Sequence, residues 1–354
     1  MKKIKVLVVG LGNMGLSHAR AYKSIKGFEI AGLCSRSIES RDDIKKEFSD
    51  VPLYSDYAHA LKATKPDAVS INTWPDTHAA YAKLALKAGC HIFIEKPLAD
   101  TVTEAEEIAK LAKVSGKKLV IGYILRVHPS WVKFVEVGKT LGKPLVMRMN
   151  LNQQSSGPQW TVHKHLMNSI SPIVDCGVHY VDVMCQVTGA KPIRVHAVGA
   201  RLTNEVDEHM YNYGHLHVAF DDGSVGWYEA GWGPMMSETA FFVKDMIGPK
   251  GSVSIAMEES KTASSDVDSH TRTSALRLHH ALLTPEGRFA TPDDIIRMDD
   301  EPGHQELCNR EQELFLDAIR HDRDMSGHVE DAINSLRIVL AADESVRTGQ
   351  MVAL

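Results

Sequence analysis

The sequence lacks the features of a membrane protein, a nucleic-acid-binding protein or a disulfide-stabilised domain. Its longest apolar runs, such as residues 4–11, have the length of one strand and are too short to cross a bilayer. The net charge is −5, and no basic stripe is present for a nucleic acid to bind. The 5 cysteines are scattered without a CxxC pair, which argues against a disulfide framework or a zinc site. We therefore expect a cytoplasmic protein with reduced thiols, no bound metal, and no nucleic-acid or membrane partner.

The first third of the chain alternates between strand and helix signals. Apolar β-rich runs occur at 4–10, 28–35, 68–73, 91–95 and 118–123, and segments with helical spacing lie at 16–25, 77–88 and 103–115. Buried strands that are each followed by a helix are typical of a parallel sheet covered on both faces. We expect an α/β Rossmann domain with a doubly wound parallel sheet over residues 1–123. Thr103 and Glu106 have capping-box spacing, so Thr103 is the expected N-cap of the third helix.

The pattern changes after about residue 124. Helical spacing appears at 129–141, 172–188, 305–320 and 329–348, and strand patterns fill most of residues 193–298. The polar segment at residues 153–165 looks irregular, and the DDG turn at 221–223 predicts a hairpin. We expect an α+β domain over residues 124–354, with an open, mainly antiparallel sheet. The last helices can pack back on the first domain.

A glycine-rich turn follows the first expected strand. Gly10, Gly12 and Gly15 form the GxGxxG pattern of GLGNMG. Between a strand and a helix, the first glycine permits the tight turn, the second lets the backbone approach a pyrophosphate, and the third permits close packing. The helix N-terminus then offers N–H groups and partial positive charge to the phosphates. We expect these glycines, with Asn13 and Met14, to bind a dinucleotide.

The end of the second expected strand bears on the choice between NAD and NADP. An acidic residue at this place would bind the adenosine ribose hydroxyls, but the sequence has Ser35 and Arg36. A hydroxyl and a guanidinium suit a 2′-phosphate, which favours NADP or the use of both cofactors. The alternative is that Arg36 stacks on the adenine and discriminates little.

Two further clusters carry side chains suited to catalysis. Glu95, Lys96 and Pro97 follow the fifth strand, where ligands of such sheets bind, so Lys96 is placed to reach the nicotinamide region. Asp175 and His179 are four residues apart on an expected helix and share one face. The histidine can accept a proton while the carboxylate orients it or binds a hydroxyl.

Two details of the second cluster are also expected. Gly177 lies between Asp175 and His179 and would keep that face of the helix open, and Asp182 would continue the same stripe. The alternative is a buried Asp–His pair that only braces the helix.

Together these motifs resemble the glucose–fructose oxidoreductase/inositol dehydrogenase (Gfo/Idh/MocA) family over nearly the whole chain. The resemblance rests on GLGNMG, NTWPDTHAAYAKLALKAGCHIFIEKPLA, DCGVHYVD and the C-terminal EDAINSLRIVLAADESVRTGQMVAL. It implies that Lys96 stabilises the substrate oxygen, that His179 takes the proton and that Asp175 supports it. It also implies a homodimer or homotetramer formed through the C-terminal sheet. The residues that would line the nicotinamide and ribose are Thr73, Trp74, Pro75, His78, Glu95 and Lys96, with Arg126 in the same pocket.

The sequence departs from the family pattern just before Asp175. Many members have two glycines there, and this chain has Ser171 and Pro172. The segment before it is also unusual, and we expect its Trp160, His163 and His165 to help select the substrate.

Histidine pairs at i, i+2 also occur, and a strand would place each pair on one face. With no cysteine or carboxylate cluster nearby, a metal site is not expected. The pairs are His163/His165 and His215/His217. The roles of His215, His217 and His304 stay open.

Three functions fit this sequence to different degrees. The favoured one is NAD(P)-dependent oxidation of a secondary alcohol on a polyol or sugar, by hydride transfer to nicotinamide C4. The alternative is an NADP-dependent reductase of an anhydrosugar, keto-sugar or imine on the same scaffold. A non-catalytic dinucleotide sensor is disfavoured because the chain keeps both Lys96 and His179. The substrate, its reacting carbon and the physiological direction stay open.

Overall fold

A computed structural model gives the fold and describes residues 2–237, 243–256, 273–299 and 301–354. The chain divides into two compact units. The first unit comprises Met1–Ile124 and Gly303–Ile333, and the second comprises Leu125–Pro302 and Asn334–Leu354. The chain therefore leaves the first unit after its sheet is complete and contributes to it again near the C-terminus.

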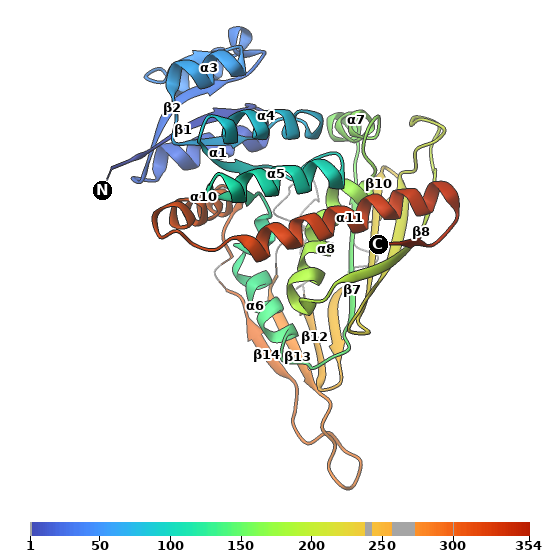
Figure 1. Cartoon of the computed structure of the whole chain (residues 1–354). Coiled ribbons are helices and arrows are strands. Elements are labelled where there is room, and N and C mark those ends of the chain that lie inside the picture. The colour runs from blue at the N-terminus through green and yellow to red at the C-terminus, as the bar shows by residue number, and fades with distance from the viewer. Residues whose placement is uncertain (1, 238–242, 257–272, 300) are drawn as a thin grey trace. The chain divides into compact units, whose positions relative to one another are not determined.

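The first unit is built on a parallel sheet of 6 strands in the order β3-β2-β1-β4-β5-β6 (Figure 1). Its strands are β1 Ile4–Val9, β2 Phe28–Cys34, β3 Leu53–Tyr54, β4 Ala68–Ile71, β5 His91–Ile94 and β6 Leu119–Ile121. Its helices include α1 Asn13–Ser24, α2 Asp42–Glu47, α3 Tyr57–Thr64, α4 Pro75–Lys87, α5 Val102–Val114 and α10 His304–Arg320. The doubly wound sheet is confirmed, and five of its strands lie within two residues of their expected ends. The sequence patterns do not predict α2, β3 and α3.

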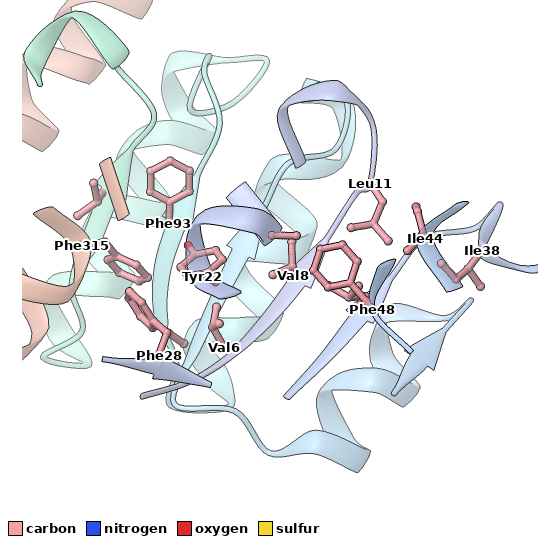
Figure 2. Close-up of a cluster of buried hydrophobic side chains, with 14 of the residues drawn as sticks. Val6, Val8, Leu11, Tyr22, Phe28, Ile38, Ile44, Phe48, Phe93 and Phe315 are labelled. Carbon is pink, nitrogen blue, oxygen red and sulfur yellow. The ribbon is translucent and has the colours of Figure 1, made fainter. Parts of the chain in front are cut away.

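A cluster of apolar side chains holds α1 and α10 to the sheet of the first unit. Tyr22 from α1 lies in the middle of this cluster, among Val6 of β1, Phe93 of β5 and Phe315 of α10 (Figure 2). The Tyr22 and Phe28 rings meet edge to face with centroids 4.8 Å apart. Phe315 comes from a part of the sequence about 200 residues beyond β6, so burial of its ring ties the returning segment to the sheet of the first unit.

The N-cap of α5 is not the expected residue. Thr101, rather than Thr103, precedes the helix, and its hydroxyl accepts a hydrogen bond from the backbone N–H of Glu104 at 3.2 Å. The Thr101 hydroxyl also donates to the Glu104 carboxylate at 3.0 Å, so the cap and the glutamate contact each other. The prediction that Thr103 is the cap is wrong by two residues, because Thr101 and Thr103 each have a glutamate three residues later and the spacing alone does not distinguish them.

The second unit is built on a sheet of 9 strands in the order β14-β13-β12-β11-β7-β10-β9-β8-β15. These strands are β7 Val146–Gln154, β8 Pro192–Ala200, β9 Tyr213–Phe220, β10 Val225–Gly233, β11 Lys244–Gly248, β12 Gly251–Ala256, β13 Ala275–His280, β14 Asp294–Arg297 and β15 Val352–Ala353. The pair β7/β10 is parallel, and the other ladders described are antiparallel, so the expected mainly antiparallel sheet is confirmed. Residues 239–242 of the strand expected before β11 lie outside the described residues.

One face of this sheet is covered by helices α6 Pro129–Gly138 and α8 Pro172–Thr188, which pack on β12 and on β7, β9 and β10 respectively (Figure 1). The bounds of α8 match the expected helix at both ends. Ser171 caps its N-terminus by accepting a hydrogen bond from the Val174 N–H at 3.1 Å, and Gly189 ends it with a φ of 60°. Its burial fixes the orientation of any polar group that it carries.

The segment expected to be irregular contains a helix, α7 Gly157–Leu166. Pro158 stands in its first turn, where its missing N–H costs nothing. The helical spacing of GPQWTVHKHL is weak, and the serines and glycine at its start favour a loop, so the sequence pattern did not predict this helix. The consequence is that His163 and His165 lie on different sides of α7, the first buried and the second exposed, so they do not form the same-face pair of a strand.

The helix α11 Ser326–Thr348 closes the chain and contributes to both units. Within the ranges that the structure describes, no helix has both the length and the apolar character that a membrane span requires.

We predict that Thr101→Ala lowers the free energy of unfolding by about 1 kcal/mol in urea denaturation, because the α5 N-terminus loses its side-chain cap. The matched control is Thr103→Ala, which changes an exposed threonine inside the same helix and should alter stability by less than about 0.5 kcal/mol. Equal losses from both substitutions would contradict the assignment of the cap.

Candidate active site

The glycine turn has the shape that a dinucleotide phosphate requires. Gly10 has a φ of 83°, and a Cβ there would lie 2.4 Å from the carbonyl oxygen of Asn72. A Cβ on Gly15 would lie 1.9 Å from the carbonyl oxygen of Gly10, so the third glycine lets α1 pack against the turn. A Cβ on Gly12 would meet nothing within 4 Å, which leaves open space above the turn. The first and third glycines are thus required by packing, and the second borders the space that a ligand can enter.

The N-terminus of α1 faces this open space with its backbone donors available. Gly12 is the N-cap residue and provides no side-chain hydrogen bond, and the first turn contains no acidic residue. Asn13 is exposed and Met14 is half-buried. A helix N-terminus with no side-chain cap and no acidic residue in its first turn suits a diphosphate, so the residues present fit the dinucleotide expected from the sequence.

The end of β2 carries the groups that would meet the adenosine end of a dinucleotide. The Ser35 and Ser37 hydroxyls lie 3.2 Å apart, and the Arg36 side chain between them is exposed. Arg41, which the sequence reading did not single out, donates from Nη1 to the Leu11 carbonyl of the glycine turn at 3.1 Å. It also pairs with Asp43, so a second guanidinium beside this turn is already held by protein groups.

A buried histidine, His78, holds the loop after β4 through contacts with backbone carbonyl groups. His78 is fully buried, with Nδ1 2.8 Å from the Pro97 carbonyl and Nε2 3.0 Å from the Thr73 carbonyl. Burial lowers the pKa of His78, and the two carbonyl oxygens oppose that shift. His78 therefore bridges two loops and is not itself at the surface, whereas Trp74 is 50% exposed and Pro75 begins α4.

Glu95 and Lys96 follow the carboxyl end of β5. Glu95 is 7% exposed, and its Oε1 lies 2.7 Å from Nε2 of His18, a residue of α1. Its Oε2 accepts the backbone N–H of Lys96 at 3.2 Å. Lys96 is half-buried and is joined to Pro97 by a cis peptide bond. Glu95 therefore holds the Lys96 backbone, and the lysine side chain extends from a loop anchored on its buried side.

In the second unit, α8 is buried almost throughout and becomes accessible at a few polar positions. Over residues 171–188 of this buried helix, the partly exposed residues are Asp175, His179 and Gln186. Asp175 and His179 are four apart and therefore lie on the same face, as expected. A carboxylate and an imidazole are therefore accessible on one face of an otherwise buried helix.

The two other residues of this stretch have different surroundings from those expected. Gly177 packs against the second unit's core, since a Cβ there would lie 3.0 Å from Cε1 of Tyr228, so its small size permits helix–sheet packing and does not keep the polar face open. Asp182 is fully buried and receives two hydrogen bonds from Arg126, at 2.8 Å from Nε and 2.6 Å from Nη2. Arg126 in turn sits in the short 3-10 helix Ile124–Arg126.

Polar and aromatic side chains from three elements gather near Asp175. His163 of α7 stacks on the ring of Trp232 with centroids 4.5 Å apart, and its Nδ1 lies 3.0 Å from the Ser155 hydroxyl. Trp232 Nε1 donates to Gln153 Oε1 at 2.6 Å. Burial lowers the pKa of His163 to about 4, although the charge of Asp175 acts in the opposite direction. A neutral imidazole at this place can accept or donate a single hydrogen bond to a hydroxyl.

The remaining candidates lie at the edges of this arrangement. Trp160 is 7% exposed and donates from Nε1 to Glu205 at 3.2 Å, while His165 is exposed on α7. Gln153, which the sequence reading missed, comes from β7, and its amide contacts both Trp232 and Cys176. No motif in the sequence marks it, because its position depends on the β7/β10 register.

The other histidines whose roles were left open are His215, His217 and His304. His215 and His217 share one face of β9, as expected, with ring centroids 5.5 Å apart. His304 begins α10, and its Nε2 lies 3.6 Å from the Cys308 sulfur. Within the described residues, the group with metal-ligand spacing is His18, Cys308 and Glu311, which lies in the first unit.

These observations define a protein with a dinucleotide-binding domain and a second unit that offers a carboxylate–imidazole pair. Two sequence profiles of one family agree with this class: an oxidoreductase family NAD-binding Rossmann fold matches residues 4–123, and an oxidoreductase family C-terminal alpha/beta domain matches residues 135–354. The chain belongs to the Gfo/Idh/MocA family of oxidoreductases. The resemblance seen in its motifs is confirmed, together with its assignment to an enzyme family that binds NAD.

Relatives with assigned activities include sugar and inositol dehydrogenases. UDP-N-acetylglucosamine 3-dehydrogenase of Acidithiobacillus ferrooxidans is 33% identical over 201 residues, which are 56% of this chain and 59% of that protein. The scyllo-inositol 2-dehydrogenase (NAD(+)) of Bacillus subtilis is 25% identical over 365 residues, covering 99% of this chain and 96% of its own.

Solved structures share the fold over nearly the whole chain. The apo scyllo-inositol dehydrogenase from Lactobacillus casei has a TM-score of 0.76 at 21% identity, covering 99% of this chain and 98% of that one. An oxidoreductase from Agrobacterium radiobacter in complex with NAD+, L-tartaric acid and magnesium has a TM-score of 0.77 at 16% identity, again covering 99% and 98%. At these identities the likeness establishes the fold alone.

We predict that two alanine substitutions in the glycine turn affect different properties, NAD affinity in one case and stability in the other. Gly12→Ala should fold like the unaltered protein but weaken NAD binding at least about tenfold, because its methyl group enters open space that the diphosphate would occupy. Gly15→Ala should instead lower the thermal midpoint, because its methyl group clashes with a backbone carbonyl. Isothermal titration calorimetry and thermal unfolding separate the two, and unchanged NAD affinity in Gly12→Ala would contradict the assigned phosphate position.

Proposed function

We propose that this protein oxidises a secondary alcohol of a polyol or sugar, transferring hydride to the C4 atom of a nicotinamide dinucleotide. The observation that carries the proposal is that each unit presents side chains suited to this reaction. In the first unit, Lys96 extends from an anchored loop at the carboxyl end of β5, and in the second unit α8 is accessible at Asp175 and His179. The proposal requires the two units to bring these side chains to one substrate.

Each side chain has a defined task in this reaction. The nicotinamide supplies the hydride acceptor when it is bound. As the C–H bond breaks, the hydroxyl loses its proton and negative charge develops on the oxygen, which the Lys96 ammonium stabilises. The His179 imidazole accepts the hydroxyl proton, because neutral histidine is basic enough to do so near neutral pH. Asp175, on the same face of α8, orients the imidazole or binds a neighbouring hydroxyl.

The dinucleotide is held by the first unit. Gly10, Gly12 and Gly15, with Asn13 and Met14, hold the diphosphate at the N-terminus of α1. Ser35 and Arg36 lie toward the adenosine. The nicotinamide and its ribose are lined by Thr73, Trp74, Pro75, Glu95 and Lys96, with His78 supporting that loop and Arg126 beside the same pocket.

A polyol or sugar is the proposed substrate class because the second unit offers polar groups held by a buried aromatic ring. His163 stacks on Trp232, which is 1% exposed, and Gln153 is hydrogen-bonded to the same indole. Neutral imidazole and amide groups bind hydroxyls. We include Trp160 and His165 in the same substrate region. The named relatives act on UDP-N-acetylglucosamine and scyllo-inositol, which are molecules of this class.

The cofactor is NAD or NADP, with a lean toward NADP or dual use. The supporting observation is that Ser35 and Arg36 occupy the place where a carboxylate would favour NAD, and that Arg36 is exposed. The same observation favours a second candidate function, an NADP-dependent reductase of an anhydrosugar, keto-sugar or imine. A non-catalytic sensor has no comparable support, since Lys96, Asp175 and His179 are all present.

We further propose that the protein forms a homodimer or homotetramer through the uncovered face of the second unit's sheet. That face carries exposed apolar side chains on neighbouring strands, among them Val146 at 41%, Val198 at 46% and Val225 at 43% exposure. Trp227 lies on the same face between β9 and β7, opposite His217 and Arg148 in register. Exposed apolar side chains grouped on one face of a sheet are typical of an interface.

We predict oxidation of one or more inositols, aldoses or sugar acids in an absorbance screen at about 340 nm, run with NAD and NADP separately. Lys96→Ala should lower kcat by about 100- to 1000-fold with dinucleotide affinity largely kept, because the developing oxyanion loses its cation. His179→Ala should lower kcat by about 100- to 10,000-fold through loss of the base. Lys87→Ala, on the exposed end of α4, is the matched control and should leave kcat unchanged.

Two results would count against this function. Normal turnover by Lys96→Ala would remove the proposed role of the ammonium. Reduction of keto-sugars or imines by NADPH, with no oxidation of any polyol or sugar, would favour the reductase instead.

We predict that the double substitution Val225→Lys and Trp227→Glu lowers the molar mass measured by light scattering to that of a smaller species, because it places charges on the uncovered sheet face. Val114→Lys, which replaces a valine that is 78% exposed at the end of α5, should not change the molar mass. An unaltered protein that is monomeric at all concentrations would contradict the assembly.

A further inference from the structure

A buried chain of hydrogen bonds reaches the Glu95–Lys96 peptide from the interior of the first unit. The Tyr22 hydroxyl donates to Oε1 of Gln312 at 2.5 Å, and Nε2 of Gln312 lies 2.9 Å from Nδ1 of His18. Nε2 of His18 lies 2.7 Å from Oε1 of Glu95, whose Oε2 accepts the Lys96 N–H. Tyr22, His18 and Gln312 are each at most 1% exposed. None of these three residues was a candidate in the sequence reading.

The Tyr22 hydroxyl sets the donor-to-acceptor direction of this series of hydrogen bonds. Burial raises the pKa of the Tyr22 hydroxyl, which therefore stays protonated and can donate. When the Gln312 oxygen accepts that proton, the amide nitrogen faces His18 and donates to Nδ1. An imidazole that accepts at Nδ1 carries its proton on Nε2 and donates it to Glu95. The chain then ends on a carboxylate.

The reverse direction would require a protonated Glu95 that donates to His18, and the surroundings of the two buried glutamates argue against it. Glu95 already accepts the Lys96 N–H at Oε2, and its Oε1 lies 2.7 Å from Nε2 of His18. In the part of the chain that the structure describes, neither oxygen of Glu311 has a hydrogen-bond partner, although the residue is only 3% exposed. Burial and the nearby Glu95 charge raise the pKa of Glu311 well above its usual range. The proton therefore belongs on Glu311 and the negative charge on Glu95.

The same cluster has ligand types that suit a metal ion, but its histidine is already occupied. His18, Cys308 and Glu311 offer atoms within 4.8 Å of one another. Both ring nitrogens of His18 have hydrogen-bond partners, so coordination would break either the Gln312 or the Glu95 contact. The contacts thus support a hydrogen-bonded assembly and not a zinc site.

We propose that Tyr22, Gln312 and His18 are positioning residues that fix the Nε2–H tautomer of His18 and thereby orient the Glu95 carboxylate that holds the Lys96 backbone. This inference rests on the proposed function, in which Lys96 stabilises the substrate oxygen. It gives the returning helix α10 a role in the reaction, because Gln312 reaches the lysine loop through α1. An error of about 1 Å in the position of a reacting group can reduce turnover about 100-fold. A set of residues that fixes the Lys96 loop can therefore have a measurable effect on turnover.

The tautomer can be measured without any activity assay. In protein labelled with 15N-histidine, a long-range 1H–15N spectrum distinguishes Nε2–H from Nδ1–H imidazole, and comparison with His18→Gln identifies the His18 signals. We expect the Nε2–H form in the unaltered protein near neutral pH. An Nδ1–H form would overturn the proposal, because Glu95 would then be the donor. This result stands even if no polyol or sugar is oxidised, so it separates failure of this inference from failure of the proposed function.

A pair of amide substitutions tests the positioning role in turnover. The amide nitrogen of a glutamine occupies roughly the place of Nε2 of histidine, whereas that of asparagine corresponds to Nδ1. His18→Gln should therefore keep the hydrogen bond to Glu95 and retain kcat within about fivefold, and His18→Asn should lower kcat about 10- to 100-fold with the KM for the dinucleotide changed less than about twofold. Equal kcat values for the two variants would overturn the proposal.

A second variant covers the case in which the histidine substitutions do not fold. Gln312→Met keeps the size of the side chain and leaves His18 and Glu95 in place, and it should lower kcat about tenfold at unchanged dinucleotide KM. Glu313→Gln is the matched control, since it changes the next, exposed residue of α10 and should leave kcat unaltered. Full activity in Gln312→Met would show that the chain does not position the lysine loop.

Discussion

The hydrogen bond between His18 and Glu95 connects the two parts of the first unit on which the proposed chemistry depends. His18 belongs to α1, the helix whose N-terminus faces the open space above Gly12. Glu95 ends β5 and holds the backbone of Lys96. Because the contact is buried, it fixes the spacing between the helix that would bind the diphosphate and the loop that carries the lysine. A dinucleotide held at one end then finds the lysine at a constant distance from its nicotinamide.

In the second unit, the helix α8 positions the proposed catalytic groups. A helix that carries the proposed catalytic carboxylate and imidazole must itself be held rigidly, and α8 is buried against β7, β9 and β10. Gly177 permits that packing by letting the Tyr228 ring approach, while Asp175 and His179 stay accessible on the same helix. The buried Arg126–Asp182 pair lies one further turn along and joins the start of this unit to α8. Rigid packing and an accessible polar face thus coexist over about two turns.

Much of the fold follows from local pattern in the sequence. The buried strands of the parallel sheet read as continuous apolar runs, and α8 is apolar enough over its whole length for both of its ends to be predicted. The short elements β3, α2 and α3 were missed because strands of two residues and helices of one to two turns leave no periodic signal. The helix α7 was missed because its serine- and glycine-rich start outweighs its apolar spacing.

The candidate site was predictable where a motif carries it and not where tertiary contacts create it. Gly10, Gly12 and Gly15 could be singled out because they form a GxGxxG motif after a strand, and Gly10 and Gly15 have steric roles that only glycine fills. Gln153 and Gln312 could not be singled out, because only their contacts with residues far away in the sequence connect them with the site. The same holds for His18, whose buried contact with Glu95 spans 77 residues. Long-range pairing, rather than residue type, identifies such groups.

The central claim is that a lysine of the first unit and a histidine of the second act on one hydroxyl group. A crystal structure of the enzyme with NAD or NADP and an oxidisable polyol tests it most directly. The account predicts one substrate hydroxyl within hydrogen-bond distance of both the Lys96 ammonium and the His179 imidazole, with its carbon facing C4 of the nicotinamide. A substrate bound with either side chain out of reach of the reacting hydroxyl would contradict it.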